Sequence, residues 1–397
     1  MSSNIGPEAQ AAYQKYLDAG SLDEKIKRLE EFLSLVPKHK ATERIVALNR
    51  SRLAKLKRQQ EEHKQRLKSL GKKSPFSIKK EGIQVILISD YYNPGVGKSS
   101  ILNYLTGAAK KKIGKFTSIP EIGIYKFKKI KFQIVDMPSI MEGASKGVGN
   151  GKEILAQIRS SDLICICIDL SRNFENQMNL ILTELSNADI KINDPPPPIT
   201  IEKTGSNKIQ IFYLTNEAQK MENMEDLNEK IIEVVQEAGI RNSIVKIYGE
   251  ITLAQVVDAL TPSVVYKDGI ILATKGDLPH TETAYLNLKN HYSSQFPLII
   301  GTSIKKNNFP NKFGEIILEY LDKIKIYTMN VSGKVAEKPL IMDNGSTVKD
   351  VAFRIHKSFK ELFDYAVVIR EGARQKKKKV GIDYKLEDND IIEIHTI

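Results

Sequence analysis

The chain of 397 residues has only two cysteines, Cys165 and Cys167, and both lie in one apolar run, 163–169. No second pair of cysteine or histidine residues follows at the spacing that a zinc site requires. Side chains two apart on a strand share a face, so Cys-x-Cys has the form of half a metal site. Two thiols buried in a core strand are the favoured interpretation.

Long apolar runs are also absent from the chain. No run approaches the roughly 20 residues that span a bilayer, and residues 1–10 lack the apolar region of a secretory signal. The content of 41% hydrophobic and 27% charged residues is that of an ordinary globular protein. We therefore expect a soluble, cytoplasmic protein of two to four domains, with no membrane partner.

Glycine and proline are scarce between residues 8 and 70, where only Gly20 and Pro37 occur. Apolar residues recur there at helical spacing, which predicts a helical hairpin or bundle over residues 1–80 with a long, basic second arm. Residues 21–80 hold 18 Lys and Arg against 7 Asp and Glu, whereas the remainder is nearly neutral. This charge favours a polyanionic partner such as RNA, and the alternative is a solvated helix face.

From residue 81 the pattern changes to alternating strands and helices. Strands are expected at 83–89, 124–128, 131–136, 163–169, 209–214, 269–273 and 297–301, and helices at 98–106, 152–160, 175–187, 224–238 and 312–323. Such alternation predicts an α/β domain over 81–326 with a parallel sheet. Four prolines at 195–198 begin a small inserted αβ subdomain of about 190–262.

The last unit, residues 327–397, has the pattern β-β-α-β-β, with its helix from about 347 to 359. This order in about 70 residues predicts a small ubiquitin-like β-grasp domain. The lysine run 376–379 precedes Val380-Gly381 and is expected in a loop.

A phosphate-binding pattern follows the first expected strand. It consists of Asn93, Pro94, Gly95, Val96, Gly97, Lys98, Ser99 and Ser100. In a Gly-Lys-Ser loop that leads into a helix, backbone N–H groups surround the phosphates, the lysine reaches the β- and γ-phosphates, and the serine binds Mg²⁺. The full pattern has a glycine where Tyr92 stands, so this motif alone does not identify the nucleotide.

Two further segments fit a magnesium-dependent phosphate site. Asp136 ends a strand, where a carboxylate holds Mg²⁺ through water, and it begins a D-x-x-G-like segment with Ser139 in place of glycine. Between these motifs Thr117 and Ser118 offer hydroxyls that complete the coordination of Mg²⁺ when a γ-phosphate is bound.

Base recognition is expected at the ends of the last two strands. Thr274, Lys275 and Asp277 form an N-K-x-D-like motif in which the aspartate accepts hydrogen bonds from guanine N1 and N2. Ser303 and Ile304 follow the next strand, where a backbone N–H reads guanine O6. Because the carboxyl ends of parallel strands meet at one edge, the four motifs together predict a guanine nucleotide site.

These motifs resemble those of the developmentally regulated GTP-binding proteins (DRG), an Obg-type GTPase family, and the chain is similar to an archaeal member. The resemblance runs from about residue 20 to the end. It rests on the segments 40–43, 139–144 with the glycines at 147, 149 and 151, 195–198, 354–358, and a C-terminal TGS domain at 327–397. The family implies GTP binding, slow GTP hydrolysis and association with ribosomes in translation.

The resemblance also implies roles for single residues. Lys98, Ser118, Asp136 and Ser139 would form the catalytic set, and Ser99, Thr117, Ser118 and Asp136 the Mg²⁺ site. Ile140 stands where many small GTPases orient water with glutamine. Gly95 stands where potassium-using relatives carry asparagine, which argues against K⁺ stimulation. Tyr92, Ser139 and Thr274 depart from the family pattern and predict weaker binding or a less responsive switch.

Two other functions remain open on the sequence. One is a non-hydrolysing RNA- or ribosome-binding assembly factor that keeps GTP as a structural ligand. The other is an ATPase of the same fold. The favoured hypothesis is a GTPase that binds GTP or GDP with Mg²⁺ and contacts the ribosome or RNA through its basic helices and TGS domain. A regulatory protein is a further possible partner.

Overall fold

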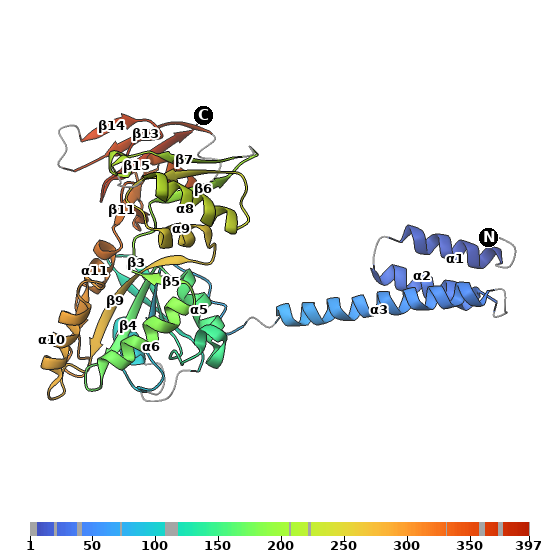
Figure 1. The fold of residues 1–397 in the computed structure, drawn as a ribbon, viewed down its shortest axis with the longest axis horizontal. Coiled ribbons are helices and arrows are strands. Elements are labelled where there is room, and N and C mark those ends of the chain that lie inside the picture. The colour runs from blue at the N-terminus through green and yellow to red at the C-terminus, as the bar shows by residue number, and fades with distance from the viewer. Residues whose placement is uncertain are drawn as a thin grey trace. The chain divides into compact units, whose positions relative to one another are not determined.

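The computed structural model describes residues 6–19, 22–37, 42–71, 74–107, 118–205, 208–220, 224–330, 332–356, 362–371 and 376–396. The chain divides into two compact units, Met1–Ser77 and Ile78–Ile397. Figure 1 labels the helices and strands of both units. None of the described helices is both long and apolar enough to cross a membrane.

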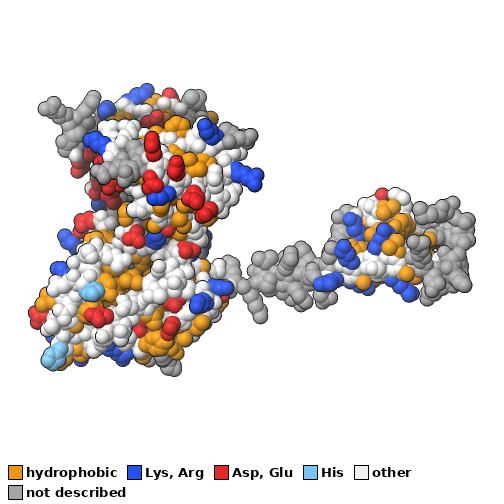
Figure 2. Space-filling view, viewed as in Figure 1, with side chains coloured by type: hydrophobic (Ala, Val, Ile, Leu, Met, Phe, Trp, Pro, Cys, Tyr) orange, Lys and Arg blue, Asp and Glu red, His pale blue; other side chains and the backbone are white. Residues whose placement is uncertain are grey.

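The first unit is a helical bundle. Its helices are α1 (Pro7–Asp18), α2 (Leu22–Leu35) and α3 (Glu43–Gly71). Leu29 and Phe32 of α2 form its core with Ala9 and Ala12 of α1, and Leu53 of α3 packs against them. Lys and Arg side chains lie on its surface, blue in Figure 2. The apolar spacing in the sequence therefore reflects packing within this unit.

A seven-stranded sheet forms the centre of the second unit. Its strands are β1 (Ile83–Ile88), β2 (Glu121–Phe127), β3 (Ile130–Asp136), β4 (Leu163–Asp169), β5 (Ile190–Ile192), β9 (Val265–Thr274) and β10 (Ile299–Gly301). The order is β10-β9-β4-β1-β3-β2, with β5 paired to β9. Every pairing is parallel except that of β2 with β3. Parallel strands bring their carboxyl ends to one edge, where the site lies.

Helices cover this sheet. They are α4 (Lys98–Thr106), α5 (Gly151–Ser160), α6 (Phe174–Asn187), α10 (Thr281–Tyr292) and α11 (Phe313–Tyr320), with short 3₁₀ turns η1 (Ala144–Lys146) and η2 (Val148–Asn150). Cys165 and Cys167 of β4 are fully buried free thiols. Burial raises the pKa of both, that of Cys167 to about 12. Both thiols pack in the core of the sheet, which agrees with their interpretation as core residues.

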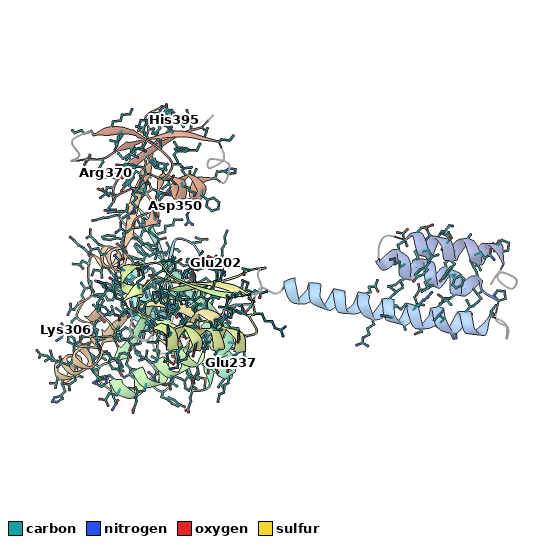
Figure 3. All side chains as sticks on the ribbon, turned by 45° about the horizontal axis from the view of Figure 1, so that its top comes forward. Glu202, Glu237, Lys306, Asp350, Arg370 and His395 are labelled. Carbon is teal, nitrogen blue, oxygen red and sulfur yellow. The ribbon has the colours of Figure 1, made fainter. Side chains whose placement is uncertain are left out.

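A smaller domain is inserted between β5 and β9. It contains β6 (Ile199–Lys203), β7 (Ile209–Tyr213), α7 (Asn216–Gln219), α8 (Met224–Glu237), β8 (Ser243–Ile247) and α9 (Leu253–Leu260). Its sheet has the order β6-β8-β7 and its own core, which includes Ile231, Val245 and Ile247. Glu202 and Glu237, labelled in Figure 3, belong to this domain.

The C-terminal domain is a five-stranded β-grasp. Its elements are β11 (Lys323–Thr328), β12 (Leu340–Asp343), α12 (Val348–Ile355), β13 (Phe363–Ile369), β14 (Lys377–Val380) and β15 (Ile391–Thr396), and its sheet order is β12-β11-β15-β13-β14. Arg370, labelled in Figure 3, ties this domain together by donating to both carboxylate oxygens of Asp390 at 2.7 Å. The expected domain boundary at residue 326 falls inside β11.

The loop expected at the lysine run is wrong. Residues 377–379 belong to β14, which pairs antiparallel with Val367, Val368 and Ile369 of β13. The backbone of this edge strand pairs with β13 while the lysine side chains stay exposed, and Val380 reaches the core. Lysines on an edge strand also discourage pairing with other chains. The remainder of the expected α/β and β-grasp architecture, with N-terminal helices, is confirmed.

Candidate functional site

The phosphate-loop residues lie between the end of β1 and the start of α4. Gly95 and Gly97 have φ values of 76° and 111°, in the left-handed region that glycine adopts without strain. The Thr274 hydroxyl lies 2.7 Å from the Val96 carbonyl and 3.0 Å from the Ile168 carbonyl. Threonine at this position therefore holds the loop against the end of β9.

Tyr92 is accommodated because its side chain leaves the loop. The side chain is 62% exposed, and its ring packs edge-on against Tyr91 with 6.0 Å between centroids. Its φ is not positive, so the backbone conformation here does not require glycine. The substitution adds bulk on the solvent side of the loop.

Lys98 begins α4 and is 8% exposed. Its ammonium contacts the hydroxyl of Ser89, which follows β1, and donates to the Ser139 hydroxyl at 3.1 Å. These two hydroxyls lie 3.2 Å apart. Ser89 was not expected from the sequence, although its position directly after a strand is a signal. The Ser139 side chain thus contacts the ammonium of Lys98, which is the group expected to bind the phosphates.

Ser99 and Asp136 bring two oxygen donors together beside Lys98. The Ser99 hydroxyl donates to Asp136 Oδ2 at 2.5 Å, and Asp136 is fully buried. The register of β1 and β3, which pairs Leu87 with Asp136, produces this contact. Mg²⁺ in phosphate sites uses one or two carboxylate or hydroxyl oxygens with substrate phosphates and water. The donor set present here fits that ion.

Of the two expected switch hydroxyls, only that of Ser118 lies in the described part of the chain, and it is not brought to this pair. Ser118 is exposed, and within the described part of the chain no hydrogen bond joins it to Ser99 or Asp136. Thr117 lies outside the described residues.

The base-recognition motifs converge beside the phosphate loop. Ser303 donates to Asp277 Oδ1 at 2.7 Å, and this hydrogen bond lowers the pKa of the half-buried carboxyl. Gly276 N–H donates to the Thr302 carbonyl at 3.0 Å, which joins the two loops. A pocket of about 360 Å³ lies there, lined by Gly95, Val96, Gly97, Ser100, Ile101, Thr274, Lys275, Asp277, Leu278, Thr302, Ile304 and Lys305. The phosphate and base motifs therefore share one cavity.

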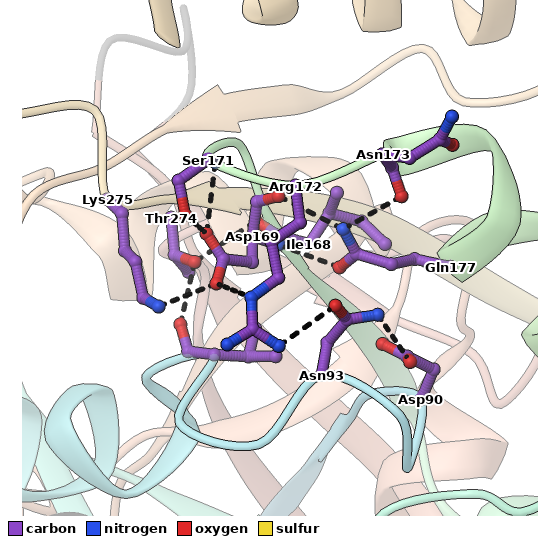
Figure 4. A network of polar contacts seen from close by, with 11 residues as sticks. Asp90, Asn93, Ile168, Asp169, Ser171, Arg172, Asn173, Gln177, Thr274 and Lys275 are labelled. Carbon is purple, nitrogen blue, oxygen red and sulfur yellow. Dashed lines mark hydrogen bonds and ion pairs between the residues drawn. The ribbon is translucent and has the colours of Figure 1, made fainter. Parts of the chain in front are cut away.

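A buried carboxylate connects these two motifs and was missed on the sequence. Asp169 ends β4, and its Oδ2 lies 2.6 Å from Lys275 Nζ and 3.6 Å from Arg172 Nε. Arg172 also donates to Asn93 Oδ1 at 3.1 Å, and Asn93 donates to Asp90 at 2.7 Å (Figure 4). The signal was available, because Asp169 stands at the carboxyl end of a correctly expected strand.

The glycine-rich segment after Ser139 is anchored to α6. Glu184 accepts hydrogen bonds from the N–H groups of Gly143 and Ser145 at 2.7 and 2.8 Å. Burial alone would raise the pKa of this carboxyl, but the two hydrogen bonds together with Lys146 outweigh it and lower the pKa. A Cβ at Gly151 would lie 2.1 Å from the Ala144 carbonyl oxygen, so the segment folds back only with glycine there.

Two family profiles match parts of the chain. A profile described as 50S ribosome-binding GTPase matches residues 93–203, and one described as TGS domain matches residues 324–396. The first contains the phosphate loop and Asp136. The second contains the β-grasp domain.

Relatives align along nearly the whole chain. An uncharacterized GTP-binding protein of Methanocaldococcus jannaschii is 34% identical over 388 residues, which cover 95% of this chain and 93% of that protein. The human developmentally-regulated GTP-binding protein 2 is 27% identical over 379 residues, covering 94% and 98%. Among solved structures, the Schizosaccharomyces pombe YchF GTPase aligns with a TM-score of 0.44 at 14% identity, over 80% of this chain and 99% of that one.

Proposed function

Because the chain belongs to the developmentally-regulated GTP-binding protein (DRG) family of GTPases, we propose that it is a GTP-driven switch that acts on the ribosome or its RNA in the cytoplasm. The observation that carries the catalytic part of the proposal is the shared pocket, where the phosphate loop meets Thr274, Lys275 and Asp277. GTP fits it with its phosphates at the start of α4 and its base against Asp277.

The residues of the pocket divide the work of binding. Backbone N–H groups at Gly97 and the start of α4 face the phosphates, since a helix N-terminus attracts anions. The Asp277 carboxylate, held ionised by Ser303, accepts from guanine N1 and N2. The Lys275 stem lies along the base while Asp169 holds its ammonium.

Hydrolysis rests on electrostatic stabilisation of the charge that develops on the phosphoryl group, with no covalent intermediate. Lys98 exchanges its contacts with Ser89 and Ser139 for the β- and γ-phosphates. Ser99 and Asp136 would hold Mg²⁺, which when bound neutralises phosphate charge. Gly95 gives K⁺ no side-chain oxygen at this loop, so we expect no potassium stimulation.

Slow turnover follows from the residue after Ser139. Ile140 is fully buried, and its N–H donates to the Ser89 carbonyl at 2.8 Å, so its side chain does not orient water. The attacking water then depends on the backbone or on a partner. We therefore propose that a ribosome or a regulatory protein accelerates hydrolysis.

Lys98→Ala tests the proposal. The purified full chain should hydrolyse GTP slowly, and ribosomes should raise the rate. In the variant, the rate with and without ribosomes should fall at least 100-fold. Lys152→Ala, on an exposed residue of α5, is the matched control and should behave as wild type. Undiminished hydrolysis by Lys98→Ala would refute the mechanism. Tight GTP retention without turnover by the wild type would support the assembly-factor alternative.

Asp277→Asn tests the choice of base. A GTPase should lose affinity for guanine nucleotides by about 100-fold. The carboxylate accepts hydrogen bonds from both guanine N1 and N2, whereas the amide of the variant has only one accepting oxygen. An ATPase would bind ATP as well as GTP before and after the change. Competition of ATP and GTP for a fluorescent GDP analogue distinguishes the two.

A further inference from the structure

A second pocket lies apart from the nucleotide pocket. It has a volume of about 690 Å³ and lies at the amino ends of β1 and β4, beside the β2–β3 turn and against β12 of the TGS domain. The phosphate loop follows the opposite, carboxyl end of β1. At about 3.3 Å per residue the strand separates the two by roughly 17 Å, so one nucleotide cannot fill both.

Basic side chains dominate this second pocket. Six of its lining residues are basic and two are acidic; the basic ones are Lys80, Lys129, Lys131, Lys323, Lys338 and Arg354. Both acids are already engaged, Asp162 with Lys80 at 2.6 Å and Asp343 with Lys323. The pocket therefore carries an excess of positive charge that its own carboxylates do not neutralise.

Three of the cations face the pocket without an acidic partner. Among the described residues, no carboxylate lies within ion-pair distance of Lys131, Lys338 or Arg354. They come from the start of β3, the segment before β12 and the end of α12. Three positive charges from separate parts of the chain therefore line one pocket. A phosphate bound there could contact two ammonium groups and the planar donor set of an arginine.

The floor of the pocket is apolar. Ile83 and Ile130 are buried there, and Leu340, Ile341 and Met342 are half-buried. Ile341 also packs against the core of the GTPase domain, so β12 and that domain form the floor together. A recess of 300 to 1,000 Å³ with an apolar floor and a few charged groups is the usual form of a small-molecule site.

We propose that this pocket is a second ligand site, which binds a compact molecule carrying two or more phosphate groups. The phosphates pair with Lys131, Lys338 and Arg354, and the less polar part of the ligand rests on Ile341 and Met342. The volume of about 690 Å³ and the apolar floor favour a small polyphosphate over an RNA backbone. This site does not depend on GTP hydrolysis. Its occupant would contact both the TGS domain and the β2–β3 hairpin, which lies between Ser118 and Ser139 in the sequence.

Titration calorimetry of the full chain with inorganic tripolyphosphate, in excess GDP, tests this site. One molecule should bind per chain, and Lys338→Ala with Arg354→Ala should weaken binding at least tenfold while GDP affinity stays unchanged. Arg50→Ala with Lys55→Ala removes the same charge from exposed positions of α3 and should change nothing.

Equal affinity in the pocket variant and the wild type would overturn the proposal, as would an equal loss in the α3 variant. Single-stranded RNA provides the second arm. If the pocket variant loses affinity for RNA but not for tripolyphosphate, the recess belongs to an RNA surface and the small-ligand site is wrong. Lys131→Gln, which changes one exposed side chain, repeats the test should the double variant unfold.

Discussion

At the scale of single residues, the catalytic motif depends on contacts with partners distant in the sequence. Lys98, Asp136 and Asp277 were expected because each occupies a fixed place in a local pattern. Ser89 and Asp169 were not, because only contacts in the folded chain identify them. Ser89 contacts Lys98, 9 residues away, and Asp169 contacts Lys275, 106 residues away. The sequence therefore predicts the candidate nucleotide ligands better than the groups that position them.

Asp169→Asn is expected to weaken GDP and GTP binding about tenfold and equally. The variant removes the buried charge that holds Lys275 at 2.6 Å, and a charge-assisted hydrogen bond contributes about 1.5–3 kcal/mol. Because Asp169 contacts no expected phosphate ligand, kcat should stay unchanged while KM rises. Steady-state kinetics and GDP affinity measure both.

Asp162→Asn is the control for this change, since it removes an aspartate paired with Lys80 before the amino end of β4. It should leave GDP affinity as in the wild type. A fall in kcat in Asp169→Asn, or no rise in KM, would contradict the positioning role.

At the scale of elements, strand 163–169 and helix 98–106 were expected at their observed limits, because continuous burial and the phosphate loop define their ends. The helix α10 was missed, since many polar residues interrupt its apolar face. Strand β14 was missed because four lysines obscure it. Its pairing with β13 depends on backbone hydrogen bonds that local composition does not reveal.

The anchor between α6 and the glycine-rich segment should depend on pH. The folded state lowers the pKa of Glu184 below its ordinary value of 4.5, so the anchor contributes stability above that value and loses it as pH falls further. Hydrogen exchange at the amides of Gly143 and Ser145 should therefore accelerate below about pH 4.5, beyond the intrinsic trend.

Glu184→Gln should lower the free energy of unfolding by about 1 kcal/mol and remove this pH dependence. Glu175→Gln changes an exposed glutamate in the first turn of the same helix and should do neither. Unchanged protection of both amides in Glu184→Gln would show that the segment is held by other contacts.

At the scale of the whole molecule, the chain forms two compact units with separate cores, so nucleotide binding and contact with a polyanionic partner can reside in different units. The helical unit has its own buried residues, and the nucleotide pocket is lined only by residues of the second unit. Composition shows the basic charge of the first unit. It does not reveal the basic second pocket, because the residues that line it are dispersed along the chain between Lys80 and Arg354.

Removal of residues 1–77 should leave GDP affinity within twofold of the full chain and abolish salt-sensitive ribosome association. Each lost phosphate contact should reduce the slope of log affinity against log salt by about 0.7 to 0.9. Sedimentation with ribosomes at several salt concentrations measures this. Undiminished sedimentation would mean that the basic helices are only a solvated surface.

The two free thiols in β4 can serve as chemical probes of unfolding. Cys165 and Cys167 are the only cysteines of the chain, and both are fully buried in β4. A thiol-reactive dye should leave the native protein unlabelled, and its uptake in mild denaturant should follow the opening of the GTPase domain alone. A cysteine introduced at an exposed position can then be labelled selectively without replacing either natural one.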